Sequence, residues 1–227
     1  MENKKEINVE KLWLGLGKFP ECETCGKECK GRLDYNDLCN NVNYLKSYAE
    51  KNFEKNRETF AELKKIMGEQ EPSFFSFGCG IGLDYFGAVE HFGDGVVYHP
   101  IENDKWAIVD TVNFKNFEPK LPKRFVKLED SIWLLYLTTK NPVLCFFNSL
   151  FTISRNTENL KDKLVSALQN KNNFYFVCDY TIDKNYHMPI IEQDFIKELL
   201  KDLRGKFAFK KFDILDGRGI IITGNRK

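Results

Sequence analysis

Three glycines at alternate positions, Gly78, Gly80 and Gly82, follow a short apolar run from Ser73 to Phe77. Glycine adopts positive φ without strain, and because it has no Cβ the main chain can approach a ligand closely. The apolar run is typical of a buried strand in a parallel sheet, and the residues after the glycines resume as a helix. The sequence therefore predicts a strand, a glycine loop and a helix, the unit that holds a nucleotide-like ligand in doubly wound folds.

The spacing of these glycines excludes two common phosphate-binding loops. A dinucleotide fingerprint requires G-x-G-x-x-G, but Leu83 or Tyr85 stands at the third glycine position in the two possible registers. The G-x-x-x-x-G-K-[ST] pattern of a P-loop is absent from the sequence as well. The G-x-G-x-G spacing that is left suits a ribose and an amino-acid group without a pyrophosphate, and an ordinary glycine turn is the alternative.

A carboxylate after the next expected strand, Val96 to Ile101, adds a second feature. Glu102 follows the last glycine by 20 residues. An acid at this place accepts hydrogen bonds from both ribose hydroxyls of an adenosine that lies over the glycine loop. The alternative for Glu102 is an acid on the solvated surface. Asp104, two residues later, could be the N-cap of the next helix.

Four cysteines lie close together near the N-terminus: Cys22, Cys25, Cys29 and Cys39. Four thiolates form a ligand set for a structural zinc ion, which would also stabilise a segment too short to bury a core of its own. The C-x2-C-x3-C spacing also suits an iron–sulfur cluster, although zinc fits better. Four reduced thiols without a metal are the alternative.

The elements that must position these groups follow from hydrophobic periodicity. An amphipathic helix is expected from Asn43 to Met67 and ends before Pro72, which divides the chain into an N-terminal cap over residues 1–70 and a main domain over 71–227. Beyond the second strand, further strands are expected over 124–128, 142–147 and 173–178, and helices over 129–139, 157–170 and 189–203.

The end of the chain alternates as two strands, 207–215 and 219–223, around the turn residues Asp216 and Gly217. The fold class expected is therefore α/β: a doubly wound, mostly parallel, seven-stranded sheet that ends in an antiparallel hairpin. A mainly helical, cysteine-containing cap precedes it.

Polar residues follow the last two parallel strands of this expected sheet. Asn148 and Ser149 come after one strand, Asp179 and Tyr180 after the other, and His187 lies in the loop beyond. Open α/β sheets place their sites at this edge, so Asp179, Tyr180 and His187 are candidates for general acid–base catalysis in a site there. An ordinary loop role is the alternative for each of the three.

The composition narrows the class of partner. The chain has 34 Lys and Arg against 33 Asp and Glu, a net charge of +1, which gives no overall attraction to nucleic acid or to an anionic membrane. No apolar run has the length of a membrane span, and the first residues do not form a signal peptide. Seven cysteines without a secretory segment are typical of the reducing cytoplasm, where we expect this protein to reside.

The glycine loop, the acid after the second strand and the closing hairpin together resemble the class I S-adenosylmethionine-dependent methyltransferases, over residues 72–227. The resemblance implies S-adenosylmethionine as the cofactor and methyl transfer to a small-molecule or protein acceptor. It also implies which residues contact the cofactor: Gly78, Cys79, Gly80 and Gly82 at its methionine part, Glu102 at the ribose, Asp130 at the adenine, and Asn148 and Ser149 beside the methyl group.

Two departures from the family pattern bear on function. Ser76 stands where the family often has an acid, and the D/N-P-P-Y/F motif of amino-methylating nucleic-acid enzymes is absent after residue 147. Two other functions remain open: a non-catalytic binding module with the methyltransferase fold, and a zinc-assisted RNA or DNA methyltransferase. The basic residues Lys27, Lys30 and Arg32, close to the cysteines, are the feature that supports nucleic-acid binding.

Overall fold

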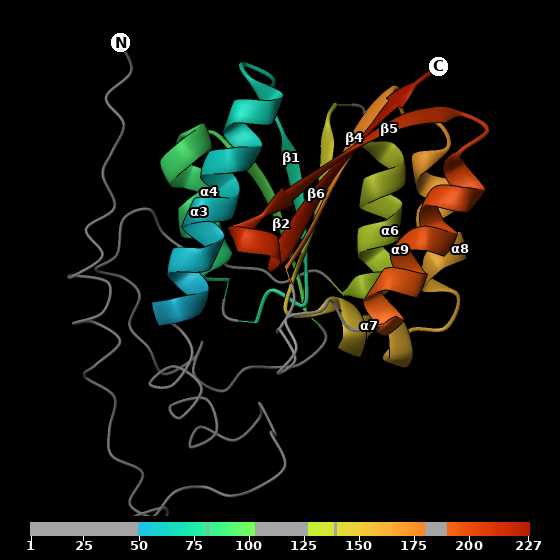
Figure 1. Ribbon diagram of the computed structural model, residues 1–227, viewed down its shortest axis with the longest axis horizontal. Coiled ribbons are helices and arrows are strands. Elements are labelled where there is room, and N and C mark those ends of the chain that lie inside the picture. The colour runs from blue at the N-terminus through green and yellow to red at the C-terminus, as the bar shows by residue number, and fades with distance from the viewer. Residues whose placement is uncertain (1–49, 81, 103–126, 139, 180–189) are drawn as a thin grey trace, which may run out of the picture.

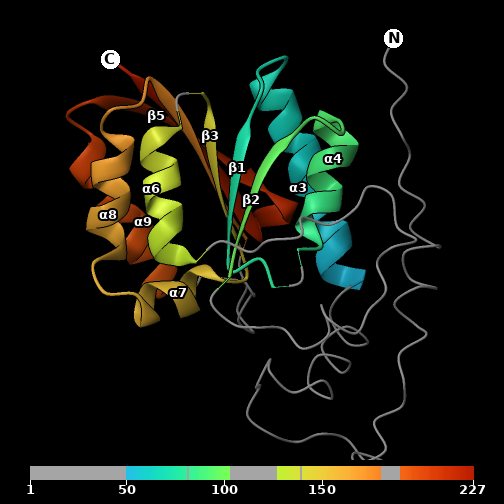
Figure 2. The same ribbon diagram turned by 180° about the vertical axis from the view of Figure 1, so that it is seen from behind.

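The computed structural model describes residues 50–80, 82–102, 127–138, 140–179 and 190–227. Within these ranges, six strands form one mixed sheet with helices on both of its faces (Figures 1 and 2). The strand order is β2-β1-β3-β4-β6-β5. The strands are β1 (Ser73–Phe77), β2 (Val97–Ile101), β3 (Pro142–Phe147), β4 (Asn173–Asp179), β5 (Phe207–Ile214) and β6 (Gly219–Arg226).

The first four strands are parallel, whereas β6 is antiparallel to both β4 and β5. Because β1 pairs with β2 on one side and with β3 on the other, the strand order reverses at β1. Doubly wound sheets bind ligands at the carboxyl ends of the strands at such a switch point.

The helices form two layers that enclose the sheet (Figures 1 and 2). One face is covered by α3 (Glu50–Met67) and α4 (Asp84–Phe92). The other face is covered by α6 (Leu128–Leu137), α8 (Leu160–Leu168) and α9 (Ile190–Leu203), while the short α7 (Leu150–Asn156) follows the carboxyl end of β3. A 3-10 turn, η3 (Leu215–Gly217), joins the two strands of the hairpin.

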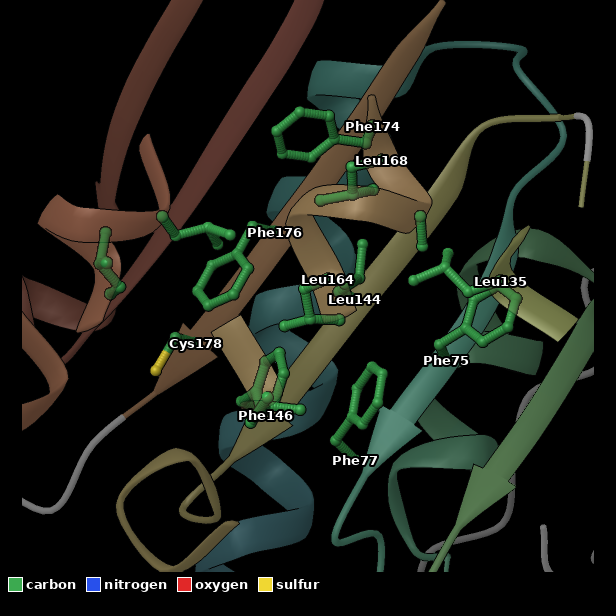
Figure 3. Close-up of a cluster of buried hydrophobic side chains, with 14 of the residues drawn as sticks. Phe75, Phe77, Leu135, Leu144, Phe146, Leu164, Leu168, Phe174, Phe176 and Cys178 are labelled. Carbon is green, nitrogen blue, oxygen red and sulfur yellow. The ribbon is translucent and has the colours of Figure 1, made fainter. Parts of the chain in front are cut away.

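Alternation along the strands divides the aromatic core between these two layers, since successive side chains point to opposite faces. Phe75 and Phe77 belong to the cluster under α6, α8 and α9, where the ring of Phe77 stacks on Phe146 with centroids 4.6 Å apart (Figure 3). Phe74 belongs to the opposite cluster, where Phe60 of α3 packs edge-on against it at 5.2 Å. The helix α3 therefore contributes to the core on its face of the sheet.

Most of the expected elements are confirmed. The observed strands match the expected ones within about two residues at their starts, and the antiparallel hairpin closes the sheet as expected, although β6 extends to Arg226. The seventh strand, expected over 124–128, falls mainly outside the described residues, and Leu128 begins α6 instead. The helix expected over 157–170 is present as α8, which is three residues shorter at its start and two at its end. The short helix α7 before it was not expected, and Asn159, in the left-handed region at φ +57°, separates the two.

The N-terminal part of the chain is described from residue 50 onward. The helix expected to begin at Asn43 is present as α3 up to Met67, as expected, whereas residues 43–49 lie outside the described ranges. The division of the chain near residue 70 stays a prediction. Across the described helices, none combines the length and the apolar character that a membrane span requires.

Candidate functional site

The glycine loop leaves β1 at the switch point of the sheet. Gly78, Gly80 and Gly82 have φ of +66°, +57° and +77°, the left-handed region in which side chains are strained. The N–H groups of Gly78 and Cys79 both donate to the carbonyl of Ile101, at 2.8 and 3.2 Å. These bonds fix the beginning of the loop against the end of β2.

Glu102, directly after β2, lies against this loop. Its Oε2 accepts a hydrogen bond from the N–H of Gly80 at 2.9 Å. The acid at the end of the second strand and the middle glycine, which the sequence placed in the same site, are therefore in direct contact.

A second carboxylate, which the sequence analysis missed, lies at the start of α4. Asp84 is 3% exposed. Its Oδ2 accepts from the hydroxyl of Ser76 in β1 at 2.5 Å, and its Oδ1 accepts from the hydroxyl of Tyr98 in β2 at 2.7 Å. Burial raises the pKa of Asp84 to about 6, and the two hydroxyl bonds oppose that rise. A polar Ser76 inside an otherwise apolar strand was the signal in the sequence for a buried polar partner.

Asn148, Asp179 and Lys55 meet at the carboxyl ends of β3 and β4. Asn148 lies in the left-handed region at φ +53°, and its N–H donates to Oδ1 of Asp179 at 2.5 Å. Lys55 of α3 reaches both residues: its Nζ lies 2.8 Å from Oδ2 of Asp179 and 3.2 Å from Oδ1 of Asn148. We refer to these three residues as the rim cluster. Lys55 was missed because a lysine on an amphipathic helix is expected to lie on the face exposed to solvent.

The two carboxylates differ in what offsets their burial. Asp179 is 1% exposed, and burial raises its pKa, but the charge and the hydrogen bond of Lys55 oppose that rise. Among the described residues, no cation lies beside Asp84. The side chains that lower its pKa are the hydroxyls of Ser76 and Tyr98. Within the described part of the chain, the site thus contains one buried acid with a cation beside it and one without.

Ser149 and Cys79 have mainly structural contacts. The hydroxyl of Ser149 donates to the carbonyl of Phe77 at 2.5 Å, which joins the start of α7 to the end of β1. A Cβ on Gly78 would come within 2.7 Å of the Ser149 Cβ, so this close packing also requires glycine. Burial, reinforced by the charges of Asp84 and Glu102, raises the pKa of Cys79 well above its usual value, so its thiol is protonated at neutral pH.

Of the other residues singled out in the sequence, the structure describes Asp130 alone. Asp130 is exposed on the first turn of α6. Tyr180 and His187 lie outside the described residues, as do the four candidate metal ligands Cys22, Cys25, Cys29 and Cys39. Within the described ranges, no group of three or more His, Cys, Asp or Glu side chains is arranged to hold a metal ion.

Comparison with known proteins shows which fold this is. No protein-family model matches the chain, and no curated protein matches it in sequence. Among solved structures, it is similar to a SAM dependent methyltransferase from Aquifex aeolicus, with a TM-score of 0.50 at 14% identity over 76% of this chain and 92% of that one.

Two further structures are similar at lower scores. The 16S rRNA methylase ArmA has a TM-score of 0.49 at 17% identity over 81% of this chain and 89% of that one. The plantazolicin methyltransferase BpumL, in complex with SAH, has a TM-score of 0.47 at 13% identity over 82% and 89% of the two chains. Identities this low show the fold alone. The chain has the fold of the class I S-adenosylmethionine-dependent methyltransferases.

Proposed function

We propose that this protein binds S-adenosylmethionine across the glycine loop and transfers its methyl group to a small-molecule or protein acceptor. When bound, this cofactor supplies a methyl group that is already activated by a positively charged sulfur. The protein's contribution is then to hold the acceptor in line with that methyl group, an effect worth up to roughly 7–11 kcal/mol in well-oriented systems.

The observation that carries the proposal is the contact between Glu102 and Gly80. It brings a carboxylate beside bare main chain at the switch point, where nucleoside ligands bind in this class of sheet. Each carboxylate oxygen can accept more than one hydrogen bond, so the bond from Gly80 leaves Glu102 able to accept from ribose hydroxyls. The residues present therefore fit an adenosyl group, with Gly78, Cys79 and Gly82 lining the rest of the loop.

The rim cluster is the part of the site that we assign to the acceptor. Both oxygens of Asp179 are engaged, one by Asn148 and one by Lys55, so its contacts favour a positioning role. Lys55, which Asp179 and Asn148 hold in place, is then the group that contacts the acceptor. Tyr180 and His187, which follow β4 in the sequence, stay candidates for a proton-transfer role.

Substitution at the centre of the loop tests cofactor binding. Gly80→Val places a branched side chain at φ +57°, against the cofactor, and should abolish binding of S-adenosylmethionine in calorimetry. The matched control is Gly205→Val, because a Cβ at Gly205 meets no atom within 4 Å. Folding of both variants is checked by circular dichroism. Unchanged affinity in a folded Gly80→Val variant would remove the loop from the proposed site.

Turnover separates an enzyme from a binding module. The protein is incubated with methyl-labelled S-adenosylmethionine and a panel of small molecules, proteins and RNA. Label in a small molecule or protein supports the proposal, whereas label in RNA assigns a nucleic-acid acceptor. Tight cofactor binding without transfer to any member of the panel favours a non-catalytic module.

A further inference from the structure

The helix α6 is apolar on its outer side as well as on the side that packs on the sheet (Figure 2). Leu128 and Leu135 are buried in the core, as expected for an inner face. On the outer side, however, Trp133 and Leu137 are each 69% exposed and Tyr136 is 48% exposed. A helix that is apolar on all sides is ordinarily covered on all sides, so this outer side is expected to have a partner.

The three exposed residues, which we call the α6 patch, form one continuous and well-anchored surface. Trp133 lies three residues before Tyr136 and four before Leu137, so they share one side of the helix. The rings of Trp133 and Tyr136 meet edge-on, with centroids 6.4 Å apart. The ammonium group of Lys171 fixes the end of the helix by donating to the carbonyls of Tyr136, at 2.8 Å, and Thr138. Such a preorganised aromatic surface loses little freedom when it binds a partner.

The size of the α6 patch fits the centre of an interface rather than a whole one. At their exposed fractions the three side chains present about 300–400 Å² of surface. A stable protein–protein interface takes about 800 Å² from each partner. The residues at the two ends of the patch must therefore contribute, and their charges indicate what kind of partner fits.

These ends carry opposite charges. Glu129, exposed on the first turn of α6, precedes Trp133 by four residues, and Lys140, exposed just beyond the helix, follows Tyr136 by four. Lys140 lies 3.3 Å from Glu71, but both side chains are largely exposed, and such a pair contributes little stability. The outer side of α6 thus has an acid, two aromatic rings and a base, in that order along the chain.

This order is complementary to its own reverse. If a second α6 lies antiparallel to the first across a two-fold axis, Glu129 stands opposite Lys140 and Trp133 stands opposite Tyr136. The acid then meets the base at both ends, and aromatic rings meet at the centre. The net charge of the chain is only +1, so two copies repel each other little.

We propose that the α6 patch is a docking surface for a second copy of this chain, which packs antiparallel to it about a two-fold axis. The same residues then serve on both copies, as in other two-fold interfaces. Trp133 and Tyr136 supply the apolar centre, and Glu129 and Lys140 fix the direction of the pair.

Sedimentation equilibrium of the full chain over a concentration series tests self-association. We expect a monomer–dimer equilibrium, and Trp133→Ala should raise its dissociation constant by at least about tenfold, because a ring is lost from the centre of the interface. The matched control Val97→Ala shortens an exposed apolar side chain on β2 and should leave the constant unchanged. Circular dichroism checks the folding of both variants.

Two results of this experiment would overturn the proposal. A wild-type chain that stays monomeric throughout the series would mean that another protein or another part of the same chain covers the α6 patch. A dimer that a folded Trp133→Ala variant does not weaken would mean that the copies meet through a different surface.

Reversal of the end charges tests the antiparallel arrangement. Glu129→Lys and Lys140→Glu each place like charges opposite one another at both ends of the pair. Each variant should self-associate more weakly than wild type by roughly threefold to tenfold, and an equimolar mixture of the two should recover the wild-type affinity. Single variants that associate as tightly as wild type would exclude this arrangement, because a parallel pair has like charges opposite one another already. Failure of the mixture to recover would show that the two charges do not meet between copies, which also overturns the proposal.

Discussion

Asp84 and Asp179 are two buried carboxylates on either side of the switch point, and the chain surrounds them differently. Asp179 meets the ammonium group of Lys55 at 2.8 Å, whereas Asp84 meets two neutral hydroxyls. Burial raises the pKa of both groups, but the charge of Lys55 opposes the rise at Asp179. One carboxylate thus forms an ion pair that joins α3 to the sheet, whereas the other is held by two hydroxyls of the sheet itself.

This difference predicts opposite effects on stability. Removing the partner of Asp179 leaves a buried charge uncompensated, so the fold should weaken. Removing the charge of Asp84 removes the cost of burying an ionised carboxylate, so the fold should gain stability.

The largest effect is expected for Lys55→Met. This variant leaves Asp179 buried, at 1% exposure, without its cation and should lower the free energy of unfolding by about 3 kcal/mol. Urea denaturation at pH 8 measures it. Lys51→Met, at an exposed position on the same helix, is the matched control and should change stability by less than about 0.5 kcal/mol.

A double variant separates loss of the ion pair from loss of packing by the lysine side chain. Lys55→Met combined with Asp179→Asn removes both charges and should recover most of the lost stability, since no buried charge is left unpaired. If the double variant is as unstable as Lys55→Met alone, the ion pair does not anchor α3, and the comparison with Asp84 loses its basis.

The second prediction concerns Asp84→Asn without ligand. The pKa of Asp84 is about 6 in the folded chain against 3.8 for the free side chain, so the folded state binds more protons between these values. The stability that protonation provides is complete below pH 3.8 and is lost as the pH rises through about 6. Asp84→Asn should therefore be more stable than wild type by up to about 3 kcal/mol above pH 7. This gap should close below pH 4.

Denaturation curves at several pH values show whether Asp84→Asn raises or lowers the free energy of unfolding. They must allow for the other titratable groups around Asp84, namely Cys79, Tyr98, Cys145 and Asp179. A variant that is less stable than wild type at pH 8 would show that Asp84 acts as a structural anchor, like Asp179.

The fold was largely predictable because its signals are local. Apolar runs, the glycine loop and the Asp216-Gly217 turn each lie within one element or between two neighbouring ones, and they gave the parallel strands and the antiparallel hairpin. The helix α7 was not predicted, because its seven residues are too few for a clear helical period.

The contacts of the candidate site also differ in how close together their residues lie in the sequence. The contact between Gly80 and Glu102 spans 22 residues of one strand–helix–strand unit, and a known spacing predicts it. The contact between Lys55 and Asn148 spans 93 residues and depends on how α3 packs across the ends of the strands. Spacing within a motif gives no information about such a contact, so the sequence analysis found Asp179 but not its cation.

The smallest effects are expected at the hydroxyl partners of Asp84. The bonds from Ser76 and Tyr98 both lower the pKa of this acid, with Ser76 the larger influence. Ser76→Ala and Tyr98→Phe should therefore each raise the pKa of Asp84 above about 6, Ser76→Ala by more. Each should cost about 1 kcal/mol of stability at pH 8.

Titration of the Asp84 carboxyl carbon by NMR measures these shifts directly, and Tyr136→Phe, on the exposed side of α6, is the control for loss of a tyrosine hydroxyl. A pKa that stays near 6 in both variants would mean that burial alone governs Asp84. In that case the hydroxyls would only fill space around the acid, and the contrast with Asp179 would reduce to the presence of Lys55. Shifts in the predicted order would instead show that Ser76 and Tyr98 keep Asp84 ionised at neutral pH, a role that Lys55 has at Asp179.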